Sequence, residues 1–190
     1  MTSRSRLSRW LMLSALALTP VVLAAPTAHA ETTEATDATR AAFTGTFQFA
    51  GGEKEKQGIE AGIDHAIDGM FFAIKGIARS KLRSATALMP TFSFAFHDHK
   101  VESRSPGNPT IVSPENGDAI SYKAADGNTY RTTQRWVGTK LVQEFVGDDG
   151  SRRNEYTLNA EGKTLTMDVT LVSPKLSHRL KYRLTYQKKQ

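Results

Sequence analysis

The sequence predicts a mainly β domain: an antiparallel up-and-down β-barrel of about eight to ten strands with a helical insertion after the first strand. Three observations lead to this fold class. Apolar residues alternate with a period of two over most of the chain after Pro90, turn pairs such as Asn116 and Gly117 separate these runs, and one segment, residues 53–83, has helical spacing instead. Twist and the need to hide edge strands favour closing so long a sheet into a barrel.

The start of the chain has the three parts of a secretory signal peptide, which are a basic start, an apolar middle and a small-residue end. A membrane-spanning helix is the alternative, but Pro20 interrupts the apolar run, which lacks the roughly 20 unbroken residues that a bilayer requires. We therefore predict that residues 1–30 are removed by Sec-type cleavage after Ala30, within "AHA", and that the protein is periplasmic or extracellular. The basic residues are Arg4, Arg6 and Arg9.

The composition excludes several function classes. The chain has no cysteine, so disulfides, cysteine nucleophiles and cysteine-based zinc sites are excluded. The formal charge of +6 falls by three once the arginines of the export signal are removed, and so weak a charge gives little support for nucleic-acid binding. We expect an exported monomer with no nucleic-acid partner.

The folded domain is predicted to begin at Phe43. Residues 31–42, "ETTEATDATRAA", are polar and aperiodic, which is typical of a flexible leader. The following "FTGTFQF" alternates Phe43 and Phe47 with small or polar residues, which predicts a first strand, and a glycine pair ends it. We therefore assign residues 43–190 to one barrel domain, with residues 53–83 as its helical lid.

Two stripes follow from the helical spacing of this lid. Large apolar residues recur at steps of three or four and predict a buried side. Small residues form a second stripe beside them, and each glycine costs about 1 kcal/mol relative to alanine in a helix, so another element must approach closely to offset that cost. Either Gly69 or Gly76 could break the segment, and we favour two helices because a single one of about 40 Å would overhang a small domain. The apolar stripe is Ile59, Ile63, Ile67, Met70, Ile74 and Ile77, and the small stripe is Gly58, Gly62, Ala66, Gly69, Ala73, Gly76 and Ser80.

Strand periodicity returns after the lid. "TFSFAFHDHKVES" reads as one strand, and further strand-like runs follow until "SHRLKYRLTYQ" at the end of the chain. Within the first of these runs, His97 and His99 would lie on one face, close enough to share a metal ion if a third ligand joined them. His65 or His178 could supply that ligand only through the fold, so we assign no metal and no cofactor.

The order of these elements resembles the calycin superfamily, which includes the lipocalins and the fatty-acid-binding proteins. The resemblance rests on a "GTF" first strand, a helical lid, a run of antiparallel hairpins and a last strand ending "YRLTYQKK". Gly45 and Phe47 stand where lipocalins have G-x-W, and a helical insertion after the first strand is similar to the lid of the fatty-acid-binding proteins. Those members are cytosolic, so the export signal makes a bacterial periplasmic lipocalin-like protein the nearer analogy.

The resemblance implies an exported, non-catalytic protein that holds a small hydrophobic or amphipathic ligand, such as a fatty acid or lipid, in its barrel. Fatty-acid-binding proteins hold the ligand carboxylate with an arginine and a tyrosine on the final strand, where this chain has Arg183 beside Tyr182. Arg183 either faces solvent or turns inward toward an acidic side chain or a ligand head group. The ligand contacts that we predict are Ile63, Ile67, Met70, Phe71 and Ile74 from the lid and Trp136, Tyr182 and Arg183 from the barrel.

A function of a different class fits the same lid. If the barrel is solid, the amphipathic residues 66–83 would instead lie on a membrane or on another protein, with phenylalanine and isoleucine side chains facing it. Asp64 and Asp68 are poor neighbours for an anionic surface and weigh against this alternative. An enzyme is not predicted, because the chain has no G-x-S-x-G nucleophile elbow and no phosphate-binding glycine loop.

Overall fold

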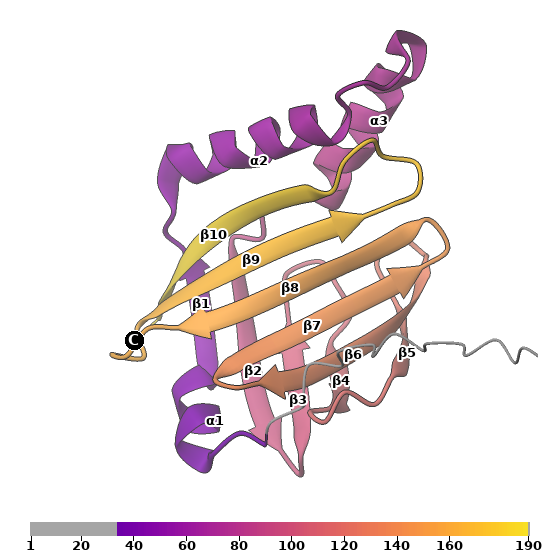
Figure 1. The fold of residues 1–190 in the computed structure, drawn as a ribbon. Helices are drawn as coiled ribbons and strands as arrows, with labels where there is room; N and C mark the ends of the chain where they lie inside the picture. Colours follow the sequence, from indigo (N-terminus) through magenta and orange to yellow (C-terminus); the bar gives the residue numbers. More distant parts are fainter. Residues whose placement is uncertain (1–33, 190) are drawn as a thin grey trace, which may run out of the picture.

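The computed structural model describes residues 34–189, and this part of the chain forms ten antiparallel strands and three helices (Figure 1). The mainly β fold class with an early helical insertion is confirmed. The export signal predicted at residues 1–30 lies outside the described residues and stays a prediction. The helices are α1 (Asp37–Phe43), α2 (Gly52–Ala66) and α3 (Phe72–Ala85). The strands are β1 (Gly45–Phe49), β2 (Thr91–His97), β3 (Lys100–Arg104), β4 (Ile111–Pro114), β5 (Ile120–Lys123), β6 (Thr129–Val137), β7 (Lys140–Gly147), β8 (Gly150–Leu158), β9 (Thr164–Val172) and β10 (Leu180–Lys188).

The strands form one sheet that curls into a nearly closed barrel. Its strand order is β4-β3-β2-β1-β10-β9-β8-β7-β6-β5, so the first and last strands of the chain are neighbours. At the remaining seam, the chain that follows β4 meets β6. There Asn116 forms a bridge with Arg135, and the Gly117 N–H donates to the Gln134 carbonyl at 3.0 Å. The predicted barrel is thus nearly closed, and its seam lies between β4 and β5.

Helix α1 corrects the prediction of a flexible leader for residues 37–42, whereas residues 31–33 of that leader lie outside the described part of the chain. The hydroxyl of Thr36 caps the helix by accepting from the Thr39 N–H at 3.2 Å, and Phe43 at its other end is buried against the rings of Trp136 and Phe94. A seven-residue helix is too short to show a period, which is why the polar composition was misleading. Figure 1 shows α1 at one end of the barrel, which we call the base.

The lid consists of two helices, as predicted, and the helical segment is interrupted near Gly69. This residue has a φ of +76°, a left-handed conformation that glycine adopts without strain. Ion pairs of Arg79 with Asp64 and of Arg83 with Glu60 join the two helices across the break. We call this end of the barrel the lid end.

Helix α2 packs along β10, beyond the point where β1 stops covering that strand (Figure 1). A Cβ added to Gly62 would lie 2.8 Å from the Lys181 carbonyl oxygen, so this glycine lets the helix approach the strand backbone. Glu55 accepts from both the N–H and the hydroxyl of Thr185, each at 2.7 Å, and so satisfies a strand edge that β1 leaves open. The close approach predicted from the small stripe is therefore confirmed at Gly62.

The first half of helix α3 stands away from the sheet, which corrects the second half of the apolar stripe; near the end of the helix, Leu82 is buried in the core. Ile59, Ile63 and Ile67 are buried, but Ile74 and Ile77 are 48% and 61% exposed. The break near Gly69 turns the stripe away from the barrel, so a single helical periodicity could not describe both halves. Within residues 34–189, no helix is both long and apolar enough to cross a membrane.

The first run after the lid is also two elements rather than one. His97 ends β2, and Asp98 and His99 form the tight turn to β3, both with positive φ. Two-residue turns with positive φ match the twist of a hairpin, and aspartate tolerates this conformation better than most residues. The two imidazoles therefore do not share a strand face, and the described residues contain no group of three or more potential metal ligands.

Candidate ligand-binding site inside the barrel

A chain of buried polar side chains crosses the interior of the barrel, and we call it the polar ladder. Gln134 on β6 donates to the Ser113 hydroxyl at 2.9 Å and to the Val101 carbonyl at 3.1 Å. Gln143 on β7 donates to the Gln134 side-chain oxygen at 3.0 Å and to the Ser103 hydroxyl at 3.2 Å. These contacts join β6 and β7 to β3 and β4 on the other side of the seam.

The ladder continues along β8 toward the lid end. Asn154 donates to the side-chain oxygen of Gln143 at 3.2 Å, and the hydroxyl of Tyr156 donates to the same oxygen at 3.1 Å. Burial raises the pKa of Tyr156 to about 12, so this hydroxyl stays protonated and can donate. Each ladder amide is thus held by at least one neighbour, which fixes its orientation.

Arg152 ends the ladder and brings a positive charge to the interior face. Its Nε donates to Asn154 at 2.9 Å, and its two terminal nitrogens donate to the Ala85 carbonyl at 3.0 Å and to the Tyr182 hydroxyl at 3.4 Å. Ala85 is the last residue of α3, so Arg152 also ties that helix to the barrel. Among the described residues, no carboxylate lies within ion-pair distance of this guanidinium.

Apolar side chains surround Arg152 on the same face. Phe145 and Leu171 lie directly opposite it on the two neighbouring strands, and both are only partly buried. Tyr182 is buried, and that burial raises the pKa of its hydroxyl. Thr132, one residue pair further along this face, is fully buried, and its hydroxyl has no hydrogen-bond partner among the described residues. The lid end therefore combines an unpaired cation, hydroxyl groups and accessible apolar surface.

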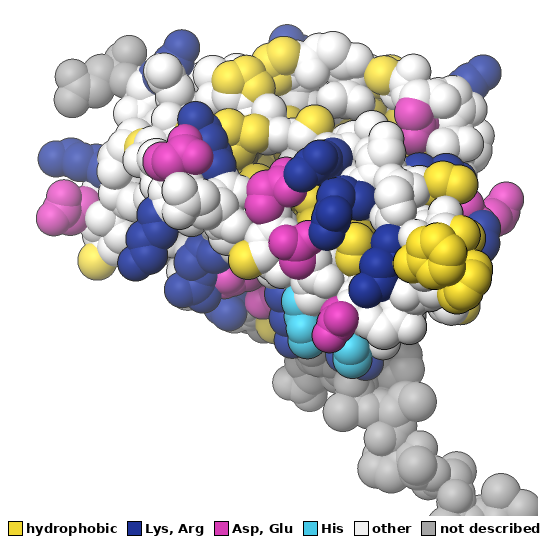
Figure 2. All heavy atoms as spheres, turned by 90° about the horizontal axis from the view of Figure 1, so that it is seen from above, with side chains coloured by type: hydrophobic (Ala, Val, Ile, Leu, Met, Phe, Trp, Pro, Cys, Tyr) yellow, Lys and Arg dark blue, Asp and Glu magenta, His cyan; other side chains and the backbone are white. Residues whose placement is uncertain are grey.

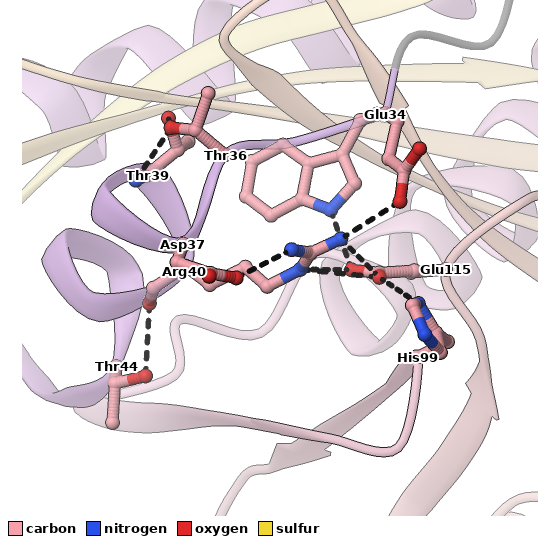
Figure 3. Close-up of polar contacts among 9 residues, drawn as sticks. Glu34, Thr36, Asp37, Thr39, Arg40, Thr44, His99 and Glu115 are labelled. Atoms are coloured by element: carbon pink, nitrogen blue, oxygen red, sulfur yellow. Dashed lines mark hydrogen bonds and ion pairs between the residues drawn. The ribbon is translucent and has the colours of Figure 1, made fainter.

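The base of the barrel is organised differently, around an ion pair between the partly buried Arg40 and the buried Glu115 (Figure 3). Glu115 accepts from the Nε of Arg40 at 3.1 Å, from an Nη of Arg40 at 2.6 Å and from the indole N–H of Trp136 at 2.9 Å. Burial alone would raise the pKa of Glu115, but the hydrogen bonds from Arg40 and Trp136 lower it below its usual value. His99 lies 3.5 Å from the same carboxylate and is itself exposed. These contacts hold α1 against the base.

Two hollows lie outside the interior. One, of about 420 Å³, is at the base beside Glu34, His99 and Glu115, and the other, of about 670 Å³, lies between α2 and the end of α3. Neither is lined by Arg152 or Tyr182. Between the two ends, buried aromatic and ladder side chains pack in the interior of the barrel.

Comparison with known proteins establishes the fold. No family model matches the chain, and no curated protein matches it, but solved structures do. A Schistosoma mansoni fatty acid binding protein in complex with arachidonic acid aligns with a TM-score of 0.50 at 14% identity, over 80% of this chain and 99% of that one. Lipid binding protein 8 of Caenorhabditis elegans in its apo form gives 0.51 at 14% identity, over 78% and 96%. A secretory abundant heat soluble protein from Ramazzottius varieornatus gives 0.53 at 9% identity, over 78% and 96%.

The chain has a calycin-like barrel fold. Within this calycin-like barrel, the three barrel residues that were predicted to contact a ligand lie in three different places. Tyr182 lies inside and contacts Arg152, whereas Trp136 lies at the base and donates to Glu115. Arg183 faces outward and pairs with Asp168 at 2.7 and 3.0 Å. The question of its orientation is thus answered, and Arg183 cannot contact a ligand in the interior.

The predicted lid contacts divide in the same way. Ile63 and Ile67 are buried in the core, and Met70 packs partly against it. Phe71 and Ile74 were expected to line the ligand site, but Phe71 is 65% exposed and Ile74 points into solvent with it. Because α3 turns away after Gly69, these two side chains lie on the outer surface of the calycin-like barrel.

Sequence reasoning missed Arg152, although a signal for it was present. In the run "SRRNEYTL", a period of two places Arg152, Asn154 and Tyr156 on one face and Arg153 and Glu155 on the other. The second face carries two opposite charges that can pair, and in the structure they do, at 2.8 Å. On the first face, Arg152 has only the neutral Asn154 and Tyr156 beside it in the sequence pattern. The second face can satisfy its own charges in solvent, so the pattern indicates that the first face points inward and carries an arginine without an acidic partner on its own strand.

Proposed function

We propose that the protein is a non-catalytic binder of a small amphipathic molecule with an anionic head group, such as a fatty acid, at the lid end of its barrel. The observation that supports this most directly is Arg152, a cation on the interior face with apolar neighbours and no carboxylate partner in the described part of the chain. From the export signal predicted in the sequence, we further propose that this binding takes place in the periplasm or outside the cell.

The chemistry of Arg152 fits a carboxylate better than the groups it now contacts. A guanidinium presents parallel N–H donors that match the two oxygens of a carboxylate, and such bonds are stronger than those to neutral acceptors. A ligand carboxylate would replace the Ala85 carbonyl as acceptor, with the Tyr182 hydroxyl as a further donor. The alkyl chain would then contact Phe145 and Leu171, which flank Arg152 on the same face.

Replacing the Ala85 carbonyl would remove one of the contacts that hold the end of α3 on the barrel, beside the buried Leu82. Ligand binding would thereby weaken this contact between the lid and the barrel. The Schistosoma mansoni neighbour was solved with arachidonic acid, and its likeness to this chain supports a barrel capable of such binding at the level of fold.

The experiment compares palmitate with its methyl ester on untagged protein by isothermal titration calorimetry. We expect the acid to bind more tightly than the ester, and we expect Arg152→Met to weaken acid binding by about 10- to 100-fold, since charged hydrogen bonds contribute about 1.5–3 kcal/mol. Arg183→Met is the matched control and should change nothing, because that arginine faces outward. Arg152→Lys should restore part of the affinity.

Two results would contradict the proposal. One is equal affinity of the parent protein for acid and ester, and the other is an equal loss in the Arg152 and Arg183 variants. Mass spectrometry of organic extracts from the gently purified protein provides an independent check, because a carrier should retain a stoichiometric apolar compound. An extract that stays clean after challenge with fatty acids and phospholipids would also reject the carrier function.

The exposed face of α3 favours a second function, contact with a membrane surface. Phe71, Phe72, Ile74 and Ile77 are 48% to 79% exposed, and the first two rings touch each other with centroids 4.8 Å apart. Figure 2 shows an apolar cluster on this face of the molecule with both basic and acidic side chains beside it. An amphipathic helix with this pattern places its apolar side into lipid and its cations against anionic head groups.

Vesicle co-sedimentation tests this second function. We expect binding to vesicles that contain phosphatidylglycerol and weaker binding to phosphatidylcholine alone, with loss of binding in a Phe71→Ser, Phe72→Ser double variant. Val146→Ser is the control, because Val146 is also exposed but lies on the barrel wall. Equal binding by the control and the double variant would show that α3 is not the contact surface.

A further inference from the structure

One buried hydroxyl group inside the barrel has no hydrogen-bond partner. The side chain of Thr132 on β6 is fully buried, and its Oγ1 lacks a partner among the described residues. By contrast, Ser103 and Ser113, the buried serines of the polar ladder, each accept from a glutamine amide. A buried polar group that stays unpaired costs free energy, which a hydrogen bond would recover.

The strand register places Thr132 in line with Arg152. Thr132 lies directly opposite Phe145 on β7, and Phe145 lies directly opposite Arg152 on β8. Residues that are paired in this way project to the same face of a sheet, so all three side chains belong to the interior face. Neighbouring strands are about 4.8 Å apart, which separates the main chains of Thr132 and Arg152 by about 10 Å.

We propose that the ligand of this site is a fatty acid with a hydroxyl group near the middle of its chain. The inference rests on the carboxylate binding proposed at Arg152 and names the class of ligand more closely. The ligand hydroxyl would form a hydrogen bond with Oγ1 of Thr132 while the carboxylate occupies Arg152. A hydroxyl next to the carboxylate does not suit a separation of about 10 Å between the two main chains, whereas a hydroxyl near the middle of the chain does.

Phe145 is the residue that lies between these two polar groups. Its ring is 6.1 Å from the ring of Tyr122 and 6.3 Å from that of Tyr130, measured between centroids, and the residue is only partly buried. A partly exposed ring changes its rotamer more readily than a close-packed core side chain does. The alkyl chain would turn this ring aside and follow the same row of residues across β7 to Thr132.

The test compares three acids on the untagged protein by isothermal titration calorimetry: stearate, stearate with a hydroxyl at carbon two, and stearate with a hydroxyl at carbon ten. We expect the acid hydroxylated at carbon ten to bind about two- to tenfold more tightly than stearate, which corresponds to one neutral hydrogen bond. The acid hydroxylated at carbon two should show no such gain.

Two variants assign this preference to one hydroxyl group. In Thr132→Val, the ratio between the affinities for the acid hydroxylated at carbon ten and for stearate should fall to about one. Thr133→Val is the matched control and should keep the ratio of the parent protein. The hydroxyl of Thr133 is also buried without a partner in the described part of the chain, but this residue lies opposite Glu144, on the other face of the sheet.

A thermal melt without ligand gives a second measurement. Thr132→Val replaces the unpaired hydroxyl with a methyl group of similar size, so we expect the melting temperature to rise. A fall in melting temperature would show that the hydroxyl already has a partner inside the protein, and it would overturn the proposal.

The calorimetry separates this inference from the function on which it rests. Equal gains from hydroxyls at carbon two and carbon ten, or a ratio that Thr132→Val leaves unchanged, would overturn the inference. Equal affinities for all three acids would also overturn it but would leave the carboxylate site at Arg152 intact. If none of the acids bound, both that site and the inference would be rejected.

Discussion

The two ends of the barrel differ in how their charges are satisfied. At the base, the partly buried Arg40 and the buried Glu115 and Trp136 form a group in which every charged atom has a near partner, and α1 covers it (Figure 3). At the lid end, Arg152 has only neutral partners, and Phe71 together with α3 exposes four large apolar side chains to solvent. The charges at the base therefore have partners within the protein, whereas the lid end leaves a cation without an acidic partner and apolar side chains without a covering surface.

This difference indicates where stability and where binding are located. Buried charges are tolerated when they are paired, and removing a partner from such a pair is costly. An unpaired cation and an exposed apolar face instead reduce stability unless a ligand or surface meets them. Removing a charged partner at the base is thus expected to destabilise the protein, and the lid end is expected to dominate interactions with other molecules.

The largest expected effect comes from breaking the base. Glu115→Ala removes the only carboxylate that contacts both Arg40 and Trp136 in the described residues, and it should lower the free energy of unfolding by about 3 kcal/mol. Asp168→Ala is the control on the barrel surface, where the exposed pair with Arg183 should contribute less than about 1 kcal/mol. Urea unfolding measures the free energy of unfolding of both variants. Equal losses would show that the ion pair at the base contributes no more to stability than the exposed pair on the barrel surface.

The same carboxylate predicts how stability depends on pH. Because the folded protein lowers the pKa of Glu115 below its usual value of 4.5, the group stabilises the fold fully above that value and loses this contribution as the pH falls through the lower, folded-state pKa. The difference in unfolding free energy between the parent protein and Glu115→Ala should therefore narrow below about pH 4.5. Urea titrations at a series of acidic pH values measure this difference, and a gap that stays constant would contradict the prediction.

Two glycines of the lid should respond in opposite directions. Gly62→Ala places a methyl group 2.8 Å from the Lys181 carbonyl and should destabilise the protein by about 1–3 kcal/mol, because backbone must move. Gly58 has no atom near its added Cβ, so Gly58→Ala should stabilise α2 by about 0.5–1 kcal/mol. Thermal melts of the two variants measure the shifts, and shifts of the same sign would show that α2 does not rest on β10 at Gly62.

The same features show which parts of the fold and of the candidate site could be predicted from the sequence. The period of two and the turn pairs predicted the barrel, because they are local consequences of strand geometry. The small stripe predicted a close approach, which occurs at Gly62. By contrast, the direction of α3 depends on one left-handed glycine, and the role of α1 depends on Glu115, which is far from it in the sequence. Such long-range pairs leave no periodic signal, so the role of Arg40 could be assigned only from the structure.

The smallest expected effect sharpens the comparison within a single apolar stripe. Ile77 is 61% exposed on α3, so Ile77→Ser should change the free energy of unfolding by less than about 0.5 kcal/mol, whereas Ile63→Val on α2, which removes one buried methyl group, should cost about 0.5–1.5 kcal/mol. Both residues belong to the stripe that the sequence presents as one buried face. If Ile77→Ser destabilised the protein as strongly as Ile63→Val, α3 would have to pack on the barrel in solution, and its apolar face would then be unavailable to a membrane.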